Sequence, residues 1–279
     1  MNKKRFLSIL VFAGLLFSCF AKKTKTAETS YPKSIVALSP SAAEILFAVG
    51  AGDQVAAVSE YTDYPAEAAA KPVVGGFDGK TLSIETIMSF KPDLVYLTEG
   101  MHNFLISTLE SNGIAYYISK GESIASVEQE ILDVGKLTGH EKEAKKVVDD
   151  MEKKLKKVAK KTGTPVKVYY EVWNAPYMSV GTTSFINDVI VKAGGENIFG
   201  DLTDAYPMVS EETIISREPA VILIPSSTGM EASAVGLRNG WSDIPAVKGG
   251  KVFVVDDNVY TRPGPRIADV VVELADLLK

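Results

Sequence analysis

Residues 82–97, LSIETIMSFKPDLVYL, and residues 209–224, VSEETIISREPAVILI, repeat one pattern within a single chain. Each copy begins with an apolar residue and Ser, continues through Glu-Thr-Ile to a second Ser, and reaches an apolar run after Pro. The first Ser is typical of a helix N-cap, and the run after Pro is typical of a buried strand in a parallel sheet. We therefore predict two related α/β halves, each with a short helix followed by a strand.

Short apolar runs alternate with helical patterns on both sides of the repeated segments, which indicates βα units. Residues 123–162 interrupt this alternation, because they are strongly charged and carry apolar residues at helical spacing. We expect an α/β fold of two Rossmann-like lobes with mainly parallel sheets, residues 34–122 and 163–279, joined by a single long helix over residues 123–162. Ser41 and Glu44 are spaced as a capping box for the first helix of the amino-terminal lobe.

The N-terminus has the layout of an export signal. A basic start, Lys3-Lys4-Arg5, precedes an apolar run over residues 6–17 that is short for a membrane span. The run ends in Leu-Phe-Ser-Cys, which resembles a bacterial lipobox and implies acylation at Cys19. We expect a lipoprotein signal peptide over residues 1–18, a polar tether over 19–33, and an exported, membrane-anchored protein on the periplasmic or extracytoplasmic face. The alternative is a plain secretory signal with an unmodified thiol.

Composition excludes several classes of function. The net charge of -5 and the pI near 5.3 argue against a nucleic-acid-binding surface. One cysteine and two histidines permit neither a disulfide, a thiolate cluster nor a three-histidine metal site. A G-x-S-x-G motif is absent from the sequence as well. We predict no catalytic residue, no metal site and no enzymatic activity. His102 follows an expected strand and is interpreted as a surface-loop histidine or, alternatively, a ligand.

Aromatic residues gather in the loops expected at strand ends. These are Tyr61, Tyr64, Phe77, Trp173, Tyr177, Tyr206, Trp241 and Tyr260. Any one of them could serve ordinary packing. Together they suggest a cleft for a large, flat, partly apolar ligand, oriented by polar groups such as Asp63 and Arg262.

The glutamates of the repeated segments, Glu85 and Glu212, allow two interpretations. Each follows its capping Ser by two residues, where a carboxylate stabilises the positive end of the helix dipole. Alternatively, they form two equivalent acidic contacts for a partner with twofold basic sites. Residue chemistry alone leaves both open.

From Ser34 to the C-terminus the chain resembles the substrate-binding proteins of cobalamin ABC importers, which belong to the helix-bridged class of siderophore, haem and cobalamin binders. The resemblance lies in IVALSPSAAEILFAVGAGDQVAAVSEYTDYP (residues 35–65), IETIMSFKPDLV (84–95), GGENIF (194–199), YPMVSEETI (206–214) and RPGPRI (262–267). It implies a membrane-anchored binding protein that captures a corrinoid and delivers it to a homodimeric ABC permease. The corrinoid would be transported cargo, so no cofactor is expected, and the protein is expected to be a monomer.

The resemblance also assigns roles to residues. Tyr61 matches a corrinoid-contacting tyrosine and Arg262 a cleft arginine, while Glu85 and Glu212 match glutamates that pair with permease arginines. Phe77 and Tyr206 stand where relatives use tryptophan, Asn258 replaces an aspartate, and Thr98 replaces a further tryptophan. The predicted ligand-binding residues are Tyr61, Asp63, Phe77, Trp173, Tyr177, Tyr206, Trp241, Asn258 and Arg262.

Other functions remain open at this point. Haem, with a tyrosine or His102 on the iron, is the nearest alternative ligand. A ferric siderophore follows, although only four arginines after the signal segment could meet an anionic chelate unless lysines substitute for them. An exported hydrolase or metal-dependent enzyme would need a catalytic or ligand cluster. An adhesive surface lipoprotein would leave the aromatic set and the repeated glutamates unused.

Overall fold

The computed structural model describes residues 31–76, 78, 80–159 and 163–279. Tyr31–Lys279 form one compact unit. The predicted signal peptide and Cys19, most of the tether, and Phe77 lie outside the described residues.

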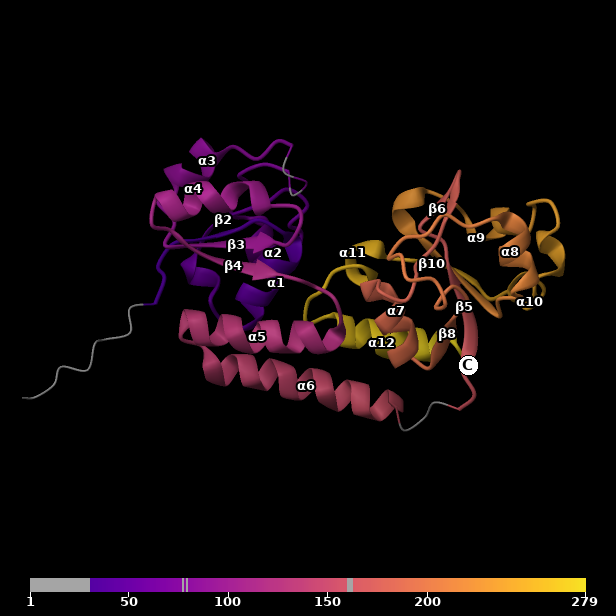
Figure 1. Ribbon diagram of the computed structural model, residues 1–279. Coiled ribbons are helices and arrows are strands. Elements are labelled where there is room, and N and C mark those ends of the chain that lie inside the picture. Colours follow the sequence, from indigo (N-terminus) through magenta and orange to yellow (C-terminus); the bar gives the residue numbers. More distant parts are fainter. Residues whose placement is uncertain (1–30, 77, 79, 160–162) are drawn as a thin grey trace, which may run out of the picture. The chain divides into compact units, whose positions relative to one another are not determined.

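The predicted pair of parallel sheets is confirmed (Figure 1). The first sheet has the order β2-β1-β3-β4 and the second the order β10-β9-β5-β8. The first contains β1 (Ile35–Ala37), β2 (Val55–Val58), β3 (Leu94–Thr98) and β4 (Ala115–Ser119). The second contains β5 (Val166–Tyr170), β8 (Gly195–Asn197), β9 (Val221–Pro225) and β10 (Val252–Val255), and a short antiparallel pair joins β6 (Trp173–Asn174) to β7 (Tyr177–Met178). Counted from the β2 edge of the first sheet and from the β8 edge of the second, the chain forms the second strand first, then the first, the third and the fourth. The two sheets therefore have the same topology.

Helices cover both faces of each sheet, as parallel sheets require. The amino-terminal lobe has α1 (Pro40–Ala48), α2 (Ala66–Ala69), α3 (Ile84–Ser89) and α4 (Ile106–Ser111), with short 3-10 turns η1 (Gly52–Gln54) and η2 (Asn103–Leu105). The carboxy-terminal lobe has α7 (Phe185–Lys192), α8 (Glu211–Ser216), α9 (Ala232–Val235), α10 (Pro245–Lys248), α11 (Asp257–Tyr260) and α12 (Ile267–Leu277), with η3 (Ser226–Thr228) and η4 (Trp241–Asp243).

The connector differs from the expected single helix, because it consists of α5 (Ile124–Thr138) and α6 (Glu141–Ala159) packed side by side (Figure 1). Gly139 ends α5 with a φ of 81°, a left-handed conformation that favours glycine and reverses the chain. Within α5, a Cβ on Gly135 would lie 2.3 Å from the Cβ of Ala144 on α6, so glycine permits the close packing of the two helices. The connector is thus a helical hairpin.

The hairpin is bonded to both lobes. At the start of α5, the backbone N–H of Ile124 donates to Asp188 of α7, at 2.8 Å. At its end, the side chain of Gln54 donates to the carbonyl of Thr138, at 3.1 Å. One apolar cluster includes buried side chains of α1, α5, α6, α7 and α12. Both lobes therefore share a core along the connector.

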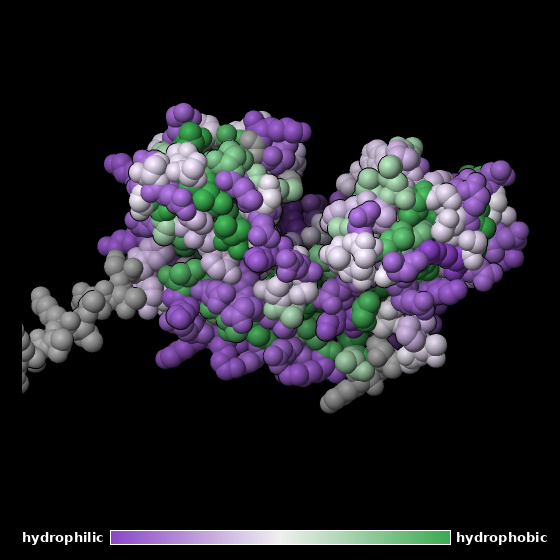
Figure 2. Space-filling view, viewed as in Figure 1, coloured by the Kyte–Doolittle hydropathy of each residue, from purple (hydrophilic) through white to green (hydrophobic). Residues whose placement is uncertain are grey.

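Two apolar clusters cover the opposite faces of the sheets. Val36, Val95 and Ile87 belong to the cluster of the first lobe. Tyr169 and Trp241 belong to that of the second. Figure 2 shows hydrophilic side chains over α5 and α6 and a surface hollowed between the two lobes.

The start of α1 corrects the predicted capping box. Ser39, rather than Ser41, is the N-cap, since its hydroxyl accepts from the backbone N–H of Ala42 and Pro40 occupies the first helical turn. Glu44 does not reach back to a cap. Its side chain is buried and bonds to the other lobe, as described below.

Candidate functional site

The repeated segments fold alike. Ser83 caps α3 and Ser210 caps α8, and each hydroxyl accepts from the backbone N–H of a Thr three residues on, at 3.2 Å. After each helix comes a residue with positive φ, Lys91 at 47° after α3 and Glu218 at 51° after α8. In both cases the next residue is the Pro that precedes strand β3 or β9. The predicted duplication is therefore present in the backbone as well as in the sequence.

Glu85 and Glu212 are exposed at equivalent positions of these helices. A hydrogen bond from the Ser83 hydroxyl, at 2.8 Å, lowers the pKa of Glu85. The backbone N–H of Glu212 and the side chain of Ser210 likewise lower the pKa of Glu212. Each lobe thus presents one ionised carboxylate at the same place in its fold, which fits either interpretation of the pair.

Three of the predicted ligand-binding aromatics are open to solvent. Tyr61 is 71% exposed, Tyr206 53% and Trp173 51%. Tyr61 follows β2 and Trp173 follows β5, so both lie beyond the carboxyl ends of parallel strands, where ligands of such sheets bind. Large apolar surfaces that remain in water are typical of binding sites.

Four of the predicted ligand-binding residues, Tyr61, Asp63, Asn258 and Arg262, meet in one cluster. The guanidinium of Arg262 donates to Asp63, to the carbonyl of Tyr61 at 3.0 Å, and to Oδ1 of Asn258 at 3.0 Å. Burial opposes the ionisation of Asp63, but the hydrogen bond and charge of Arg262 outweigh it and lower the pKa of Asp63. Asn258 keeps an acceptor where relatives are expected to have a carboxylate. The cluster joins the amino-terminal lobe to the carboxy-terminal lobe.

Trp241 was predicted to contact ligand, but its side chain is fully buried. It packs against Tyr169 and Tyr177, and its Nε1 donates to Glu211 at 2.7 Å. Trp241 lies in η4, ahead of β10, and belongs to the apolar core cluster of the carboxy-terminal lobe. Tyr177 is half-buried beside it and also donates to Glu211, at 3.1 Å, while Tyr260 is buried.

His102 is not a surface histidine. Its side chain is fully buried, and its Nδ1 accepts from the backbone N–H of Thr98 at 2.9 Å. Thr98 ends β3 and is half-buried. In this position His102 stabilises the turn after β3.

Sequence reasoning missed an ion pair between the lobes. Arg266 donates to the buried carboxylate of Glu44 through Nε at 2.9 Å and Nη2 at 2.7 Å. Its guanidinium also lies over the ring of Tyr64, 4.0 Å from the ring centre. The available signal was a Glu at a helix position whose neighbours, such as Ile45, are core residues. Exposed Met101, Phe104 and Met208 were also missed, although the first two follow β3.

The arginines of the described chain are all paired with carboxylates. Arg217 pairs with Asp201, Arg238 with Glu171, Arg262 with Asp63 and Arg266 with Glu44. The Arg238 pair is buried, with its carboxylate 1% exposed. A guanidinium already held in this way is poorly placed to receive an anionic ligand.

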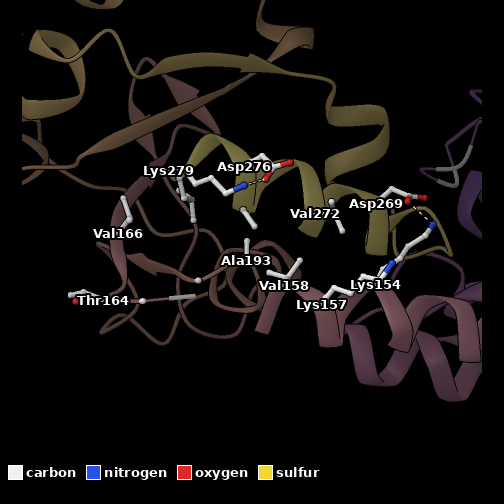
Figure 3. Close-up of a pocket in the computed structure, with 14 residues that line it drawn as sticks. Lys154, Lys157, Val158, Thr164, Val166, Ala193, Asp269, Val272, Asp276 and Lys279 are labelled. Carbon is white, nitrogen blue, oxygen red and sulfur yellow. Dashed lines mark hydrogen bonds and ion pairs between the residues drawn. The ribbon is translucent and has the colours of Figure 1, made fainter. Parts of the chain in front are cut away.

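A cavity of about 460 Å³ lies away from these residues, between α6, α12 and the start of β5 (Figure 3). Its lysines are partly engaged, since Lys154 pairs with Asp269 and Lys279 with Asp276. It contains none of the predicted ligand-binding residues.

Among residues 31–76, 78, 80–159 and 163–279, no group of three or more His, Cys, Asp or Glu could hold a metal ion. None of the helices described there is long and apolar enough to cross a membrane.

Two parallel α/β lobes with exposed aromatic residues after their strands define a class of ligand-binding proteins. Residues 35–259 match the periplasmic binding protein family, and the chain belongs to that family. It is thus an extracytoplasmic binding component of transport and not an enzyme.

Two relatives of known name match most of the chain. The chain is 33% identical over 255 residues to the uncharacterized ABC transporter substrate-binding lipoprotein YvrC of Bacillus subtilis, covering 88% of this chain and 79% of that one. It is 28% identical to the vitamin B12-binding protein of Vibrio parahaemolyticus, covering 99% and 96%.

Solved structures agree with this placement. The periplasmic vitamin B12 binding protein BtuF of Vibrio cholerae superposes with a TM-score of 0.77 at 26% identity, covering 88% of this chain and 96% of that one. A possible iron-binding protein of Staphylococcus epidermidis gives a TM-score of 0.77 at 29% identity, covering 89% and 99%. The predicted fold and class are confirmed.

Proposed function

We propose that this binding protein captures a corrinoid, in the form of cobalamin, and delivers it to an ABC permease. The relative from Vibrio parahaemolyticus that spans 99% of the chain is named a vitamin B12-binding protein, and a relative in Halobacterium salinarum, 29% identical over 92% of the chain, is named a cobalamin-binding protein. The ligand would lie between the lobes, where both contribute residues.

The observation that carries the proposal is the combination of exposed aromatic rings with paired arginines. Tyr61 from one lobe and Trp173 and Tyr206 from the other offer apolar surface to a large, flat ligand. The two arginines that contact the loop of Tyr61, Arg262 and Arg266, are engaged by Asp63 and Glu44, so they favour a ligand of low charge over an anionic one. A corrinoid with amide side chains fits this chemistry better than an anionic ferric siderophore does.

Haem is the second candidate, and the exposed hydroxyl-bearing rings favour it. Tyr61 or Tyr206 could bind the iron, as tyrosine does in some haem proteins. His102 is a poor candidate for that role, because it is buried and its Nδ1 already accepts a hydrogen bond. Arg262 and Arg266, the arginines that contact the loop of Tyr61, are already paired with Asp63 and Glu44, so neither guanidinium is well placed to bind the carboxylates of haem.

Delivery would use Glu85 and Glu212 as docking residues. Both are exposed and ionised, and they occupy equivalent positions in two lobes of the same strand order. A homodimeric permease would offer one basic site to each lobe. We further propose that the protein acts as a monomer held to the membrane through lipid on Cys19, which keeps it close to the permease.

Charge reversal tests the docking role. We expect the double variant E85K/E212K to abolish cobalamin uptake while the affinity of the purified protein for cyanocobalamin is unchanged. The matched control is E67K/E231K, which reverses two exposed glutamates at the starts of α2 and α9. The control should transport normally. Undiminished uptake by E85K/E212K would exclude docking through these residues and leave helix stabilisation as their role.

A further inference from the structure

The segment that joins α11 to α12 sends two arginines into the amino-terminal lobe. Arg262 and Arg266 are four residues apart and flank Gly264. A Cβ on Gly264 would lie 2.9 Å from a carboxylate oxygen of Glu44, so glycine allows the segment to approach the other lobe closely. Each arginine then binds a different carboxylate there, Asp63 and Glu44.

The second of these pairs is largely withdrawn from water. The Glu44 side chain is 3% exposed and the Arg266 side chain 25%. The carboxylate receives three donors from Arg266, because the backbone N–H adds a bond of 3.2 Å to those of the guanidinium. A buried charge requires such compensation, and removal of one partner alone would leave the other unpaired.

The Arg262–Asp63 pair holds the strained residue Tyr61 in place. Tyr61 has a φ of 61°, a left-handed conformation that is unfavourable for a residue with a Cβ. The Arg262 side chain is 10% exposed and that of Asp63 54%, and the guanidinium donates to the carbonyl of Tyr61 and to the carboxylate of Asp63. The conformation that presents the exposed ring of Tyr61 is thus held from the opposite lobe.

We infer that Arg262 is a positioning residue and not a ligand contact, and that with Arg266 it forms a two-point interlobe lock. Arg262–Asp63 and Arg266–Glu44 are the two points. The lock fixes the spacing of the lobes and sets the orientation of Tyr61. Asp63 and Asn258 act through Arg262 in the same way. The part of this inference that concerns ligand rests on the proposed corrinoid function.

A double-mutant cycle separates positioning from contact, with cyanocobalamin as the probe. If Arg262 acts through Tyr61, R262Q and Y61A each weaken binding by about tenfold or more, and the double variant is no weaker than the worse single variant. R262K should fall between wild type and R262Q, since lysine keeps the charge but lacks the planar, two-nitrogen guanidinium that reaches Asp63, the Tyr61 carbonyl and Asn258. Additive losses would show that Arg262 contacts the ligand itself and would overturn the inference, as would wild-type affinity in R262Q.

The matched control for the cycle is R217Q. Arg217 also donates to a carboxylate, Asp201, and its guanidinium lies 4.7 Å from the ring centre of Phe199, but both partners belong to the same lobe. Cyanocobalamin affinity should be unchanged in R217Q. An equal loss there would attribute the effect of R262Q to general destabilisation and contradict the lock.

Spin labels test the lock without ligand. Labels placed at the exposed positions Ser111 and Ser233, one in each lobe and with Cys19→Ser in the background, report the interlobe distance in the full chain. We expect one narrow distance in wild type and a broadened distribution in D63N/R262Q combined with E44Q/R266Q, which neutralise both members of each pair. An unchanged distribution would overturn the lock. A wild-type protein that binds no cyanocobalamin would instead refute the corrinoid proposal, and the distances would still decide the lock.

Discussion

The buried carboxyl group of Glu130 links the connector to the first sheet. Oε1 accepts from the hydroxyl of Tyr96 and Oε2 from that of Ser119, at 3.0 Å, and the side chain is almost fully buried. Burial raises the pKa of Glu130, and the two hydrogen bonds only partly offset this effect. The fold therefore opposes ionisation of this residue.

The sign of the pH effect follows from this shift. Because the pKa of Glu130 is higher in the folded than in the unfolded chain, stability is lost as pH rises from below about 4.5 through the folded pKa. We expect E130Q to gain stability relative to wild type as pH is raised from 4 to 7, since the amide carries no charge and can bond both hydroxyls. Thermal unfolding over this pH range measures the difference.

The control is E110Q, an exposed carboxylate that accepts from Tyr116 at 2.9 Å. Thermal unfolding of E110Q over the same pH range measures the effect of replacing an exposed Glu by Gln. A constant difference between E130Q and wild type would contradict the account of Glu130.

Helices α3 and α8 both end at a residue with positive φ. Lys91 and Glu218 are exposed and adopt left-handed backbone conformations before Pro. Glycine tolerates this conformation without strain, although it also adds conformational freedom to the unfolded chain. We expect K91G to raise the free energy of unfolding by up to about 1 kcal/mol, measured by urea denaturation.

Ala70 provides the opposite case. It is the exposed C-cap residue of α2, and its φ of -84° lies in the right-handed helical region. A70G should lower the free energy of unfolding, because glycine gains nothing there. Destabilisation by K91G as large as that by A70G would refute strain at Lys91.

Elements with a local signal were predicted well. Ser83 and Ser210 do cap their helices, and the apolar runs after Pro92 and Pro219 are buried strands, because capping and strand burial depend on neighbouring residues. The division of the connector was missed as an architectural feature, even though Gly139 marks it, since a helical hairpin and one long helix share the same periodicity.

At the scale of the whole molecule, the site was only partly predictable. The rule that ligands bind beyond carboxyl ends of strands located Tyr61 and Trp173 on exposed loops, whereas Trp241, which precedes its strand, became a core residue. The Glu44–Arg266 pair joins residues 222 positions apart, and sequence spacing carries no signal for such a contact. Local chemistry therefore suggested candidate residues, and tertiary packing decided which of them are exposed and which are buried.

The proposed function is the binding of a corrinoid between the two lobes. Its most direct test is calorimetric and spectroscopic titration of Tyr31–Lys279, which form one compact unit, with cyanocobalamin and separately with haemin. The account predicts saturable one-to-one binding of cyanocobalamin that is weakened in Y61A. Absence of cyanocobalamin binding together with a saturable change in the haemin spectrum would contradict it and assign the site to haem.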